Sequence, residues 1–301
     1  MQIGAMDSEW SELPFKHRIR RIAELGFKGV QLWMTTAELG FDIPLTWFPP
    51  AWTPQRSSLS PKELVDLTRD VGLEITAMGP HYVLGEPPRF WGETGWSRFT
   101  TARGKEERLK DIKNLIEYTA HMDVKNLALF SGGSPNEIEY WPCLVDMMRE
   151  LADEAEKAGV VLAVENMPQL LVKDEDDLLR LIREVESDAV RVMFDPKNLN
   201  DAPPGRRDIP AAVRKLKGYI VHTHVGDSIY GGYEFGKNSQ GKWIVPVPGK
   251  GEVPFPRYLE ALKEIGYDGW LVVEYAGDAR GLEPGMIESK EYIEKLLKSI
   301  F

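Results

Sequence analysis

Four short apolar runs of the sequence each lead into side chains that could bind a metal ion or transfer a proton. Glu165 closes VVLAVE, Glu274 closes GWLVVE, Asp195 follows VRVMF, and His222 and His224 close YIVHTH. Carboxylates and imidazoles are common general acids and bases in enzymes, and they also bind divalent cations. Their chemistry depends on whether the fold brings them together.

The apolar runs alternate with amphipathic stretches along the whole chain. Candidate strands are Gln2–Met6, Gly29–Trp33, Leu73–Met78, Asn126–Phe130, Val160–Glu165, Val190–Phe194, Tyr219–His224 and Trp270–Glu274. Candidate helices lie near 14–25, 60–71, 104–121, 138–158, 174–186, 207–216, 255–265 and 287–299. This repeated alternation predicts an α/β fold, the (β/α)8 TIM barrel.

The lengths of the connections favour the same fold. Several predicted helices end in a Gly just before the next strand, as in ELGFKGV, DVGLEI, KAGVVL and EIGYDGW, which is typical of short connections. The connections that follow the strands are longer, at about 34–59, 79–103, 195–206 and 226–254. We therefore expect one domain over 1–301 with its site at the C-terminal ends of the strands. An open doubly wound sheet is the alternative, but no GxGxxG motif follows the first strand.

In such a barrel the four polar strand ends meet at one mouth. Glu165, Asp195, Glu274 and an imidazole then lie close together. Three carboxylates in that arrangement repel one another and raise one another's pKa unless a cation lies between them. The sequence therefore predicts a divalent metal site. A set of oxygen ligands with one nitrogen is more typical of Mn²⁺, Mg²⁺ or Co²⁺ than of a structural zinc ion, which is usually bound by thiolates.

The composition restricts the partners and the compartment. The formal charge is −10, from 37 basic and 47 acidic residues, and the basic residues are scattered, which disfavours nucleic acid. The single Cys143 allows no internal disulfide, the first residues lack a signal-peptide pattern, and no apolar run approaches the roughly 20 residues of a membrane span. We expect a soluble, cytoplasmic protein that acts on a small molecule without membrane or nucleic acid, and a homo-oligomer is left open.

The order of the motifs resembles the xylose isomerase-like TIM-barrel superfamily. The matching features are Glu at the end of the fifth strand, Asp-Pro-x-Asn after the sixth, His-x-His-x-x-Asp at the seventh, PGKGEVPF before a helix, and Glu at the end of the eighth. The nearest resemblance is to its sugar isomerase/epimerase branch of ketose 3-epimerases, hydroxypyruvate isomerases and inosose dehydratases. It implies that Glu165, Asp195, His224 and Glu274 bind the metal and that the two glutamates act as acid and base. We expect Mn²⁺, with Mg²⁺, Co²⁺ and Zn²⁺ as alternatives.

The sequence departs from the ketose 3-epimerases in the residues that would contact the sugar. Those enzymes carry a His three residues after the strand-six Asp, an Arg six after the ligand His, and a Glu six after the strand-five Glu. This chain has Asn198, Tyr230 and Leu171 at those positions. The resemblance therefore implies the metal site but a relaxed or different substrate.

Four residues are predicted to contact the substrate. His81 follows the third strand, and Trp33 closes the second and could stack on the apolar face of a sugar. Asn198 lies one turn past the strand-six Asp, and His222 alternates with His224 on one face of its strand. The plainer alternatives are a loop cap for His81, core packing for Trp33, a loop turn for Asn198, and a second-layer or core histidine for His222.

The predicted reaction is isomerisation or epimerisation of a ketose or related α-hydroxyketone through an enediolate. An inosose-type dehydratase that uses the same metal site is the alternative. A metal-dependent endonuclease and a non-catalytic sugar-binding barrel are less favoured, because that endonuclease branch has a His where Asn198 stands and because the ligand set is intact.

Two loops are predicted to cover the mouth. The segment from Gly226 to Pro248 is long and rich in glycine, which favours a lid. Trp47, Phe48 and Trp52 lie in LTWFPPAWTP and should either roof the pocket or form a subunit contact.

Overall fold

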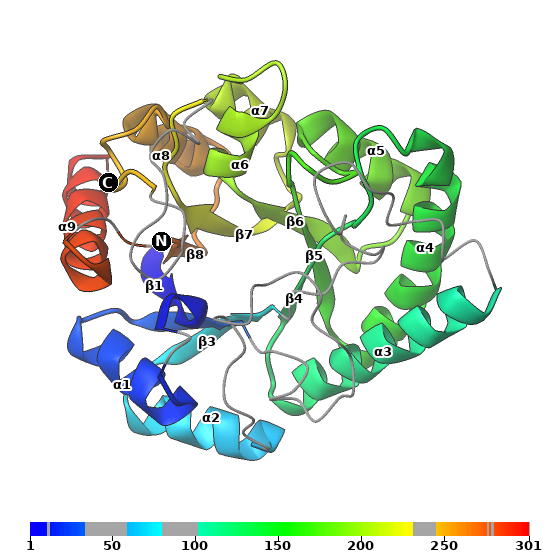
Figure 1. Cartoon of the computed structure of the whole chain (residues 1–301), viewed down its shortest axis with the longest axis horizontal. Coiled ribbons are helices and arrows are strands. Elements are labelled where there is room, and N and C mark those ends of the chain that lie inside the picture. Colours follow the sequence, from blue (N-terminus) through cyan, green and yellow to red (C-terminus); the bar gives the residue numbers. More distant parts are fainter. Residues whose placement is uncertain are drawn as a thin grey trace.

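Parallel strands close into a barrel in the computed structural model of the chain, which describes residues 1–10, 13–33, 59–79, 102–230, 245–275, 277 and 280–300. The strands are β1 Gln2–Met6, β2 Gly29–Leu32, β3 Glu74–Met78, β4 Asn126–Leu129, β5 Val161–Glu165, β6 Val190–Phe194, β7 Ile220–Val225 and β8 Trp270–Val273. They pair in chain order, and β1 pairs with β8 (Figure 1). The predicted (β/α)8 barrel is confirmed, and the open doubly wound sheet is excluded.

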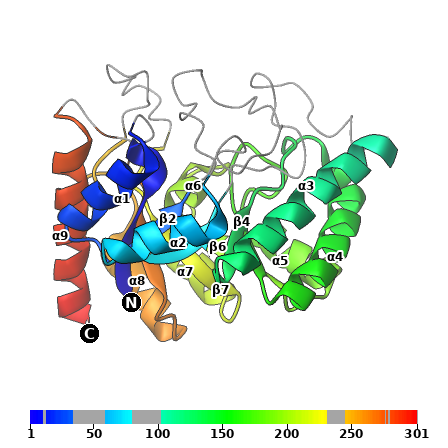
Figure 2. The same cartoon turned by 90° about the horizontal axis from the view of Figure 1, so that it is seen from below.

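The helices surround the barrel and follow the strands in alternation (Figures 1 and 2). They are α1 Phe15–Glu24, α2 Pro61–Asp70, α3 Ala102–His121, α4 Trp141–Ala158, α5 Glu175–Val185, α6 Pro196–Asp201, α7 Ile209–Lys215, α8 Phe255–Glu264 and α9 Leu282–Ile300. Short 3₁₀ turns span Asp7–Trp10 and Ile138–Tyr140.

The strands are buried on both faces, as a parallel sheet covered by helices requires. Their outward side chains join the helices in one large core. The inside of the barrel holds a separate small cluster of Ala77, Ala128, Ala163 and Met193, with Val221 packed against it. Small alanine side chains there leave the interior room for larger polar groups.

The local signals that the sequence carries for helix ends work as predicted. Gly26, Gly72, Gly159 and Gly266, the glycines of the four repeated endings, all have positive φ angles between 70° and 82°. Left-handed glycines end helices and let the next strand begin within a few residues. Ser60 starts α2 with a capping box, in which its side chain accepts from the backbone N–H three residues on.

Two helices differ from the prediction. Helix α6 lies within 195–206, where a loop was predicted, because Asp195 caps it and Pro196 is its first residue. Helix α9 begins at Leu282 instead of 287, because Pro284 and Gly285 fall in its first turn, where Pro is tolerated.

Several predictions concern residues outside the described ones. His81, Trp47, Phe48 and Trp52 and the central part of the lid segment, 231–244, belong to this group. Their predicted roles stay predictions. No helix in the part of the chain that the structure describes combines the length and apolar character needed to cross a membrane.

Candidate metal centre

The ends of β5 and β6 are tied together by one amide. Asn166 directly follows Glu165, and its Nδ2 donates to the carbonyl oxygen of Asp195 at 2.9 Å. The backbone N–H of Asp195 donates in return to Asn166 Oδ1 at 2.9 Å. This reciprocal pair ties the residue after Glu165 to Asp195 and so holds the ends of β5 and β6 together. Asn166 was no site residue in the sequence prediction, although its amide directly after a strand-ending acid is the signal that could have identified it.

The two carboxylate oxygens of Asp195 have different partners. Oδ1 accepts from the backbone N–H groups of Lys197 at 2.7 Å and Asn198 at 3.1 Å and so caps α6. Oδ2 is buried, has no hydrogen-bond partner within the described part of the chain, and lies 3.8 Å from Nδ1 of His224. Burial opposes ionisation of Asp195, but His224, Lys197 and the helix N–H groups outweigh it and lower the pKa.

His224 lies at the centre of the acidic residues. Its Nδ1 is 3.4 Å from Glu165 Oε1 and 3.6 Å from Glu274 Oε2. Its Nε2 is 2.9 Å from Oε1 of Gln31 on β2. The imidazole is 1% exposed. One ring nitrogen therefore faces the carboxylates, and the other is held by an amide.

The electrostatics of this arrangement favour a cation. The pKa of Glu165 is raised to about 7: burial is the largest cause, His224 opposes it, and the charges of Asp195 and Glu274 add to it. Burial alone would lower the pKa of His224, but the facing carboxylates hold it well above its ordinary value. In the metal-free protein, protons on Glu165 and His224 thus offset part of the negative charge of the clustered carboxylates.

The donor atoms fit a divalent metal ion. Glu165, Asp195 and His224 each offer one ligand atom, and these atoms lie within 4.8 Å of one another. Asp195 Oδ2, His224 Nδ1 and Glu274 Oε2 have no hydrogen-bond partner among the residues that the structure describes. Buried polar atoms without partners are costly, and a shared cation would satisfy all three. The residue types, oxygen with one nitrogen, suit a hard or borderline divalent ion.

Lys197 and Asn198, which follow Asp195 in α6, lie beside the centre. Asn198 Nδ2 donates to Glu165 Oε1 at 3.0 Å, so the predicted substrate contact also touches a predicted acid/base group. Lys197 Nζ lies 3.5 Å from Glu274 Oε2. Burial would lower the pKa of Lys197, but Glu274 and Asp195 outweigh it and raise the pKa, so the ammonium is charged.

His222 lies one layer deeper in the barrel than His224. Its Nε2 is 3.1 Å from Thr76 Oγ1, its side chain is fully buried, and its ring meets that of His224 edge to face at 6.0 Å between centroids. Burial holds its pKa well below the ordinary value, so it is neutral. These contacts favour a second-layer group, and direct substrate contact stays a prediction.

Trp33 follows β2 at the mouth, where the sequence analysis expects an apolar wall. It is half-buried, and its backbone N–H donates to Oδ1 of Asp7 at 2.6 Å. Asp7 in turn pairs with the buried Arg18 at 3.3 Å. The backbone of Trp33 is thus fixed to Asp7, which follows β1, and through Asp7 to α1. Stacking of its ring on a substrate stays a prediction.

The final Asp of the His-x-His-x-x-Asp motif holds the backbone of a following segment by hydrogen bonds. Its carboxylate, that of Asp227, accepts from the backbone N–H groups of Gly249, Gly251 and Val253 at 2.8 to 3.0 Å. A Cβ on Gly251 would lie 2.3 Å from Asp227 Oδ1, so only glycine fits. This explains why PGKGEV accompanies the motif: the carboxylate fixes the segment between β7 and α8.

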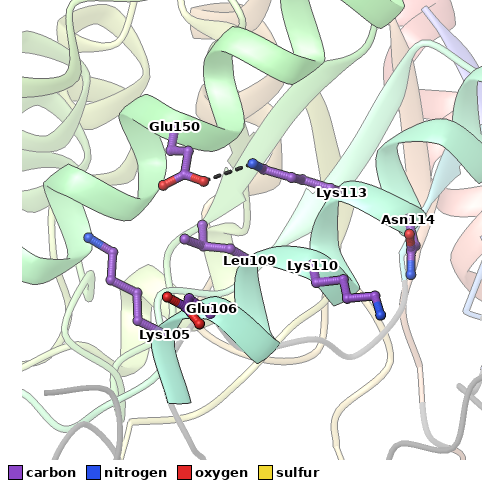
Figure 3. Close-up of a pocket in the computed structure, with 7 residues that line it drawn as sticks. All are labelled: Lys105, Glu106, Leu109, Lys110, Lys113, Asn114 and Glu150. Atoms are coloured by element: carbon purple, nitrogen blue, oxygen red, sulfur yellow. Dashed lines mark hydrogen bonds and ion pairs between the residues drawn. The ribbon is translucent and has the colours of Figure 1, made fainter. Parts of the chain in front are cut away.

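A groove on the outer surface lies apart from these residues. Figure 3 shows it between α3 and α4, with Lys105, Lys110 and Lys113 along α3. Lys113 spans it to pair with Glu150 at 2.7 Å (Figure 3). This ion pair links two outer helices, and we assign the groove no part in the metal centre.

Known proteins share this architecture. A family model described as xylose isomerase-like TIM barrel matches residues 19–296. The chain is 28% identical over 137 residues to D-psicose 3-epimerase of Ruminiclostridium cellulolyticum, covering 44% of this chain and 41% of that protein. It is 24% identical over 170 residues to inosose dehydratase of Lacticaseibacillus casei, covering 51% and 54%. The chain thus spans about half the length, or less, of these curated relatives. The crystal structure of D-psicose 3-epimerase with D-tagatose from Clostridium cellulolyticum H10 shares the fold, with a TM-score of 0.72, 19% identity and 99% coverage of both chains.

Asp195→Asn should remove bound metal and keep helix α6. The amide oxygen can still accept from the first N–H groups of the helix, whereas its NH₂ places a donor where a ligand oxygen is needed. We expect the Mn²⁺ affinity, measured by isothermal titration calorimetry, to fall by about 100-fold or more. That loss exceeds the one expected for a residue that contacts a metal ligand without binding the metal itself. Asp208→Asn is the matched control, because Asp208 caps α7 in the same way. Metal affinity near wild type in Asp195→Asn would contradict the ligand assignment.

Metal affinity should increase with pH through about 7. Glu165 has a pKa of about 7 in the metal-free protein, and the pKa of His224 is raised, so both hold protons that an ion must displace. Below these pKa values the ligands are protonated and binding is weak, and above them binding is strong. Titrations from about pH 6 to pH 8 in buffers of different ionisation enthalpy would also count the released protons. An affinity that is independent of pH would contradict this electrostatic account.

Proposed function

The chain belongs to the xylose isomerase-like TIM barrel family, and we propose that it is a divalent-metal-dependent isomerase or epimerase of a ketose or related α-hydroxyketone. Family membership gives the general class, and the proposal concerns the reaction, the metal and the roles of single residues. The small-molecule substrate and the preference for Mn²⁺ over Mg²⁺, Co²⁺ or Zn²⁺ are parts of the same proposal.

One observation carries the proposal. Asp195 Oδ2, His224 Nδ1 and Glu274 Oε2 face one another without hydrogen-bond partners in the described part of the chain, and Glu165 Oε1 lies 3.4 Å from the same nitrogen. These four residues would hold the ion. A divalent ion held there would supply Lewis acidity, which polarises a substrate carbonyl and makes the adjacent C–H bond more acidic.

Glu165 and Glu274 are the proposed acid/base pair. A pKa of about 7 for Glu165 in the metal-free protein is near the value that suits a base at neutral pH, and Asn198 orients one of its oxygens. The side chain of Glu274 is 22% exposed, so it lies on the more open side of the centre. One glutamate removes the proton next to the carbonyl, which gives an enediolate, and the other returns a proton.

The product depends on where the proton returns. Return to the opposite face of the same carbon gives an epimer, and return to the neighbouring carbon gives an isomer. Loss of a β-hydroxyl from the same enediolate gives dehydration, and the similarity to inosose dehydratase of Lacticaseibacillus casei supports this as the second candidate. An endonuclease is disfavoured by the charge of −10. A non-catalytic sugar-binding barrel is disfavoured by the intact ligand set.

The proposal is tested first by turnover with Mn²⁺ over ketoses, inososes and hydroxypyruvate, followed by mass spectrometry of the product formed in D₂O. An epimerase or isomerase should leave the product mass unchanged apart from deuterium at the deprotonated carbon, and a dehydratase should lower the mass by one water. A shielded base that returns the same proton gives an unlabelled product of unchanged mass. If the protein with Mn²⁺ consumes none of these substrates, that result would count against the proposed class.

Replacing either glutamate with Gln should abolish most turnover and leave metal bound. Gln keeps an oxygen for the ion but cannot take up a proton, so the rate should fall by the 10²- to 10⁴-fold typical of lost acid–base catalysis. The measurements are kcat and metal content for Glu165→Gln and Glu274→Gln. Glu154→Gln, on the exposed side of α4, is the control. Rates near wild type in both variants would end the two-glutamate mechanism.

Lys197→Met should lower turnover without loss of metal. The Lys197 ammonium lies beside Glu274 and can donate to a substrate oxygen that becomes negative during the reaction, an effect worth roughly 10²-fold in kcat. Lys197→Arg keeps the charge and should retain part of the activity. Steady-state kinetics and elemental analysis of both variants would check this. A kcat for Lys197→Met that equals wild type would restrict Lys197 to a counter-ion of Glu274.

A further inference from the structure

We propose that Gln31 is a positioning residue that holds His224 with Nδ1 toward the metal. Gln31 lies on β2, is 1% exposed, and places Oε1 2.9 Å from His224 Nε2. The two residues are 193 positions apart in the chain. The inference rests on the metal role proposed for His224.

The orientation of the amide follows from both of its ends. Gln31 Nε2 faces Met193 Sδ at 3.9 Å, a weak acceptor, which leaves Oε1 turned toward the imidazole. An amide oxygen can only accept, so the facing Nε2 of His224 must carry a proton. In the neutral ring the lone pair then lies on Nδ1, the atom that faces Glu165, Asp195 and Glu274.

The opposite orientation would disable the ligand. If the amide nitrogen faced Nε2, the neutral ring would carry its proton on Nδ1, pointing at the carboxylates, and its lone pair would point away from the ion. Metal-bound histidines generally donate their second N–H to an acceptor, which fixes the ring and strengthens the ligand. Gln31 supplies that acceptor here.

The barrel keeps the two imidazoles of β7 on separate partners. His224 is held by Gln31, and His222 is held by Thr76 Oγ1 at 3.1 Å. The pairing of β2 with β3 shifts by one residue between Val30 and Gln31, from Ile75 to Ala77. Such a bulge redirects side chains, and here it leaves Thr76 and Gln31 each opposite one imidazole. The two contacts can therefore be removed one at a time.

The test measures Mn²⁺ affinity by calorimetry without any substrate. Gln31→Met keeps the size of the side chain and removes the acceptor, and we expect a 10- to 100-fold loss of affinity. Gln31→Glu restores an acceptor oxygen and should recover most of the affinity. Thr76→Val removes the bond to His222 instead and should leave the affinity within about twofold of wild type, which separates this role from a general loss of packing.

A second measurement uses the wild type alone. In the Zn²⁺-loaded protein, ¹⁵N–¹H correlation spectra of the histidine rings should show the His224 proton on Nε2 and the metal on Nδ1. Undiminished Mn²⁺ affinity in Gln31→Met would overturn the positioning role and leave the proposed function intact. Metal on Nε2 would overturn the positioning role and also the assignment of His224 Nδ1 as a ligand atom. Absence of Mn²⁺ binding by the wild type would overturn both.

Discussion

Three carboxylates around one buried imidazole are the arrangement on which the rest of the site depends. At an effective dielectric constant of about 20, two unit charges about 4 Å apart interact by roughly 4 kcal/mol, so uncompensated like charges of this kind resist burial. The protein stabilises them individually. Asp195 caps a helix, Asn198 donates to Glu165, Lys197 pairs with Glu274, and Gln31 holds His224. Asp195 and His224 are held through Oδ1 and Nε2, so Asp195 Oδ2 and His224 Nδ1, which face the centre, stay available for a cation.

The barrel supplies the positions for these contacts. Parallel strands that alternate with helices send all their C-terminal ends to one mouth, so residues far apart in sequence become neighbours. The exchange of hydrogen bonds between Asn166 and Asp195 ties the ends of β5 and β6 together. Asp227 fixes the chain beyond β7 through three backbone N–H groups of the following segment. The joined strand ends and the segment bound by Asp227 thus restrict the positions of the ligands, as a precise site requires.

The sequence departs from the pattern of the ketose 3-epimerases that it resembles at positions predicted to contact the substrate. Tyr230 stands where those enzymes carry an Arg, and it lies 39% exposed with its ring under the Arg206 guanidinium. Leu171 stands where they carry a Glu, and it is buried in the core. Neither residue supplies a polar group equivalent to the one it replaces. Lys197 and Asn198 lie next to the centre and offer polar groups to a substrate, which is consistent with the proposal of a substrate other than that of those enzymes.

The sequence by itself determined the order of strands and helices, the helix-ending glycines and the four polar strand ends. These features depend on hydrophobic spacing and backbone conformation within a few residues, so they can be read locally. It also carries the signal for α6, an Asp followed by Pro, within a segment whose length predicts a loop. Only the tertiary structure decided that Gln31 contacts His224 and that Lys197 reaches Glu274. Those contacts depend on how the strands align around the closed barrel, including the register shifts beside Gln31 and Met193. The direction of a side chain across a closed sheet is set by the packing of the whole barrel and not by its neighbours in sequence.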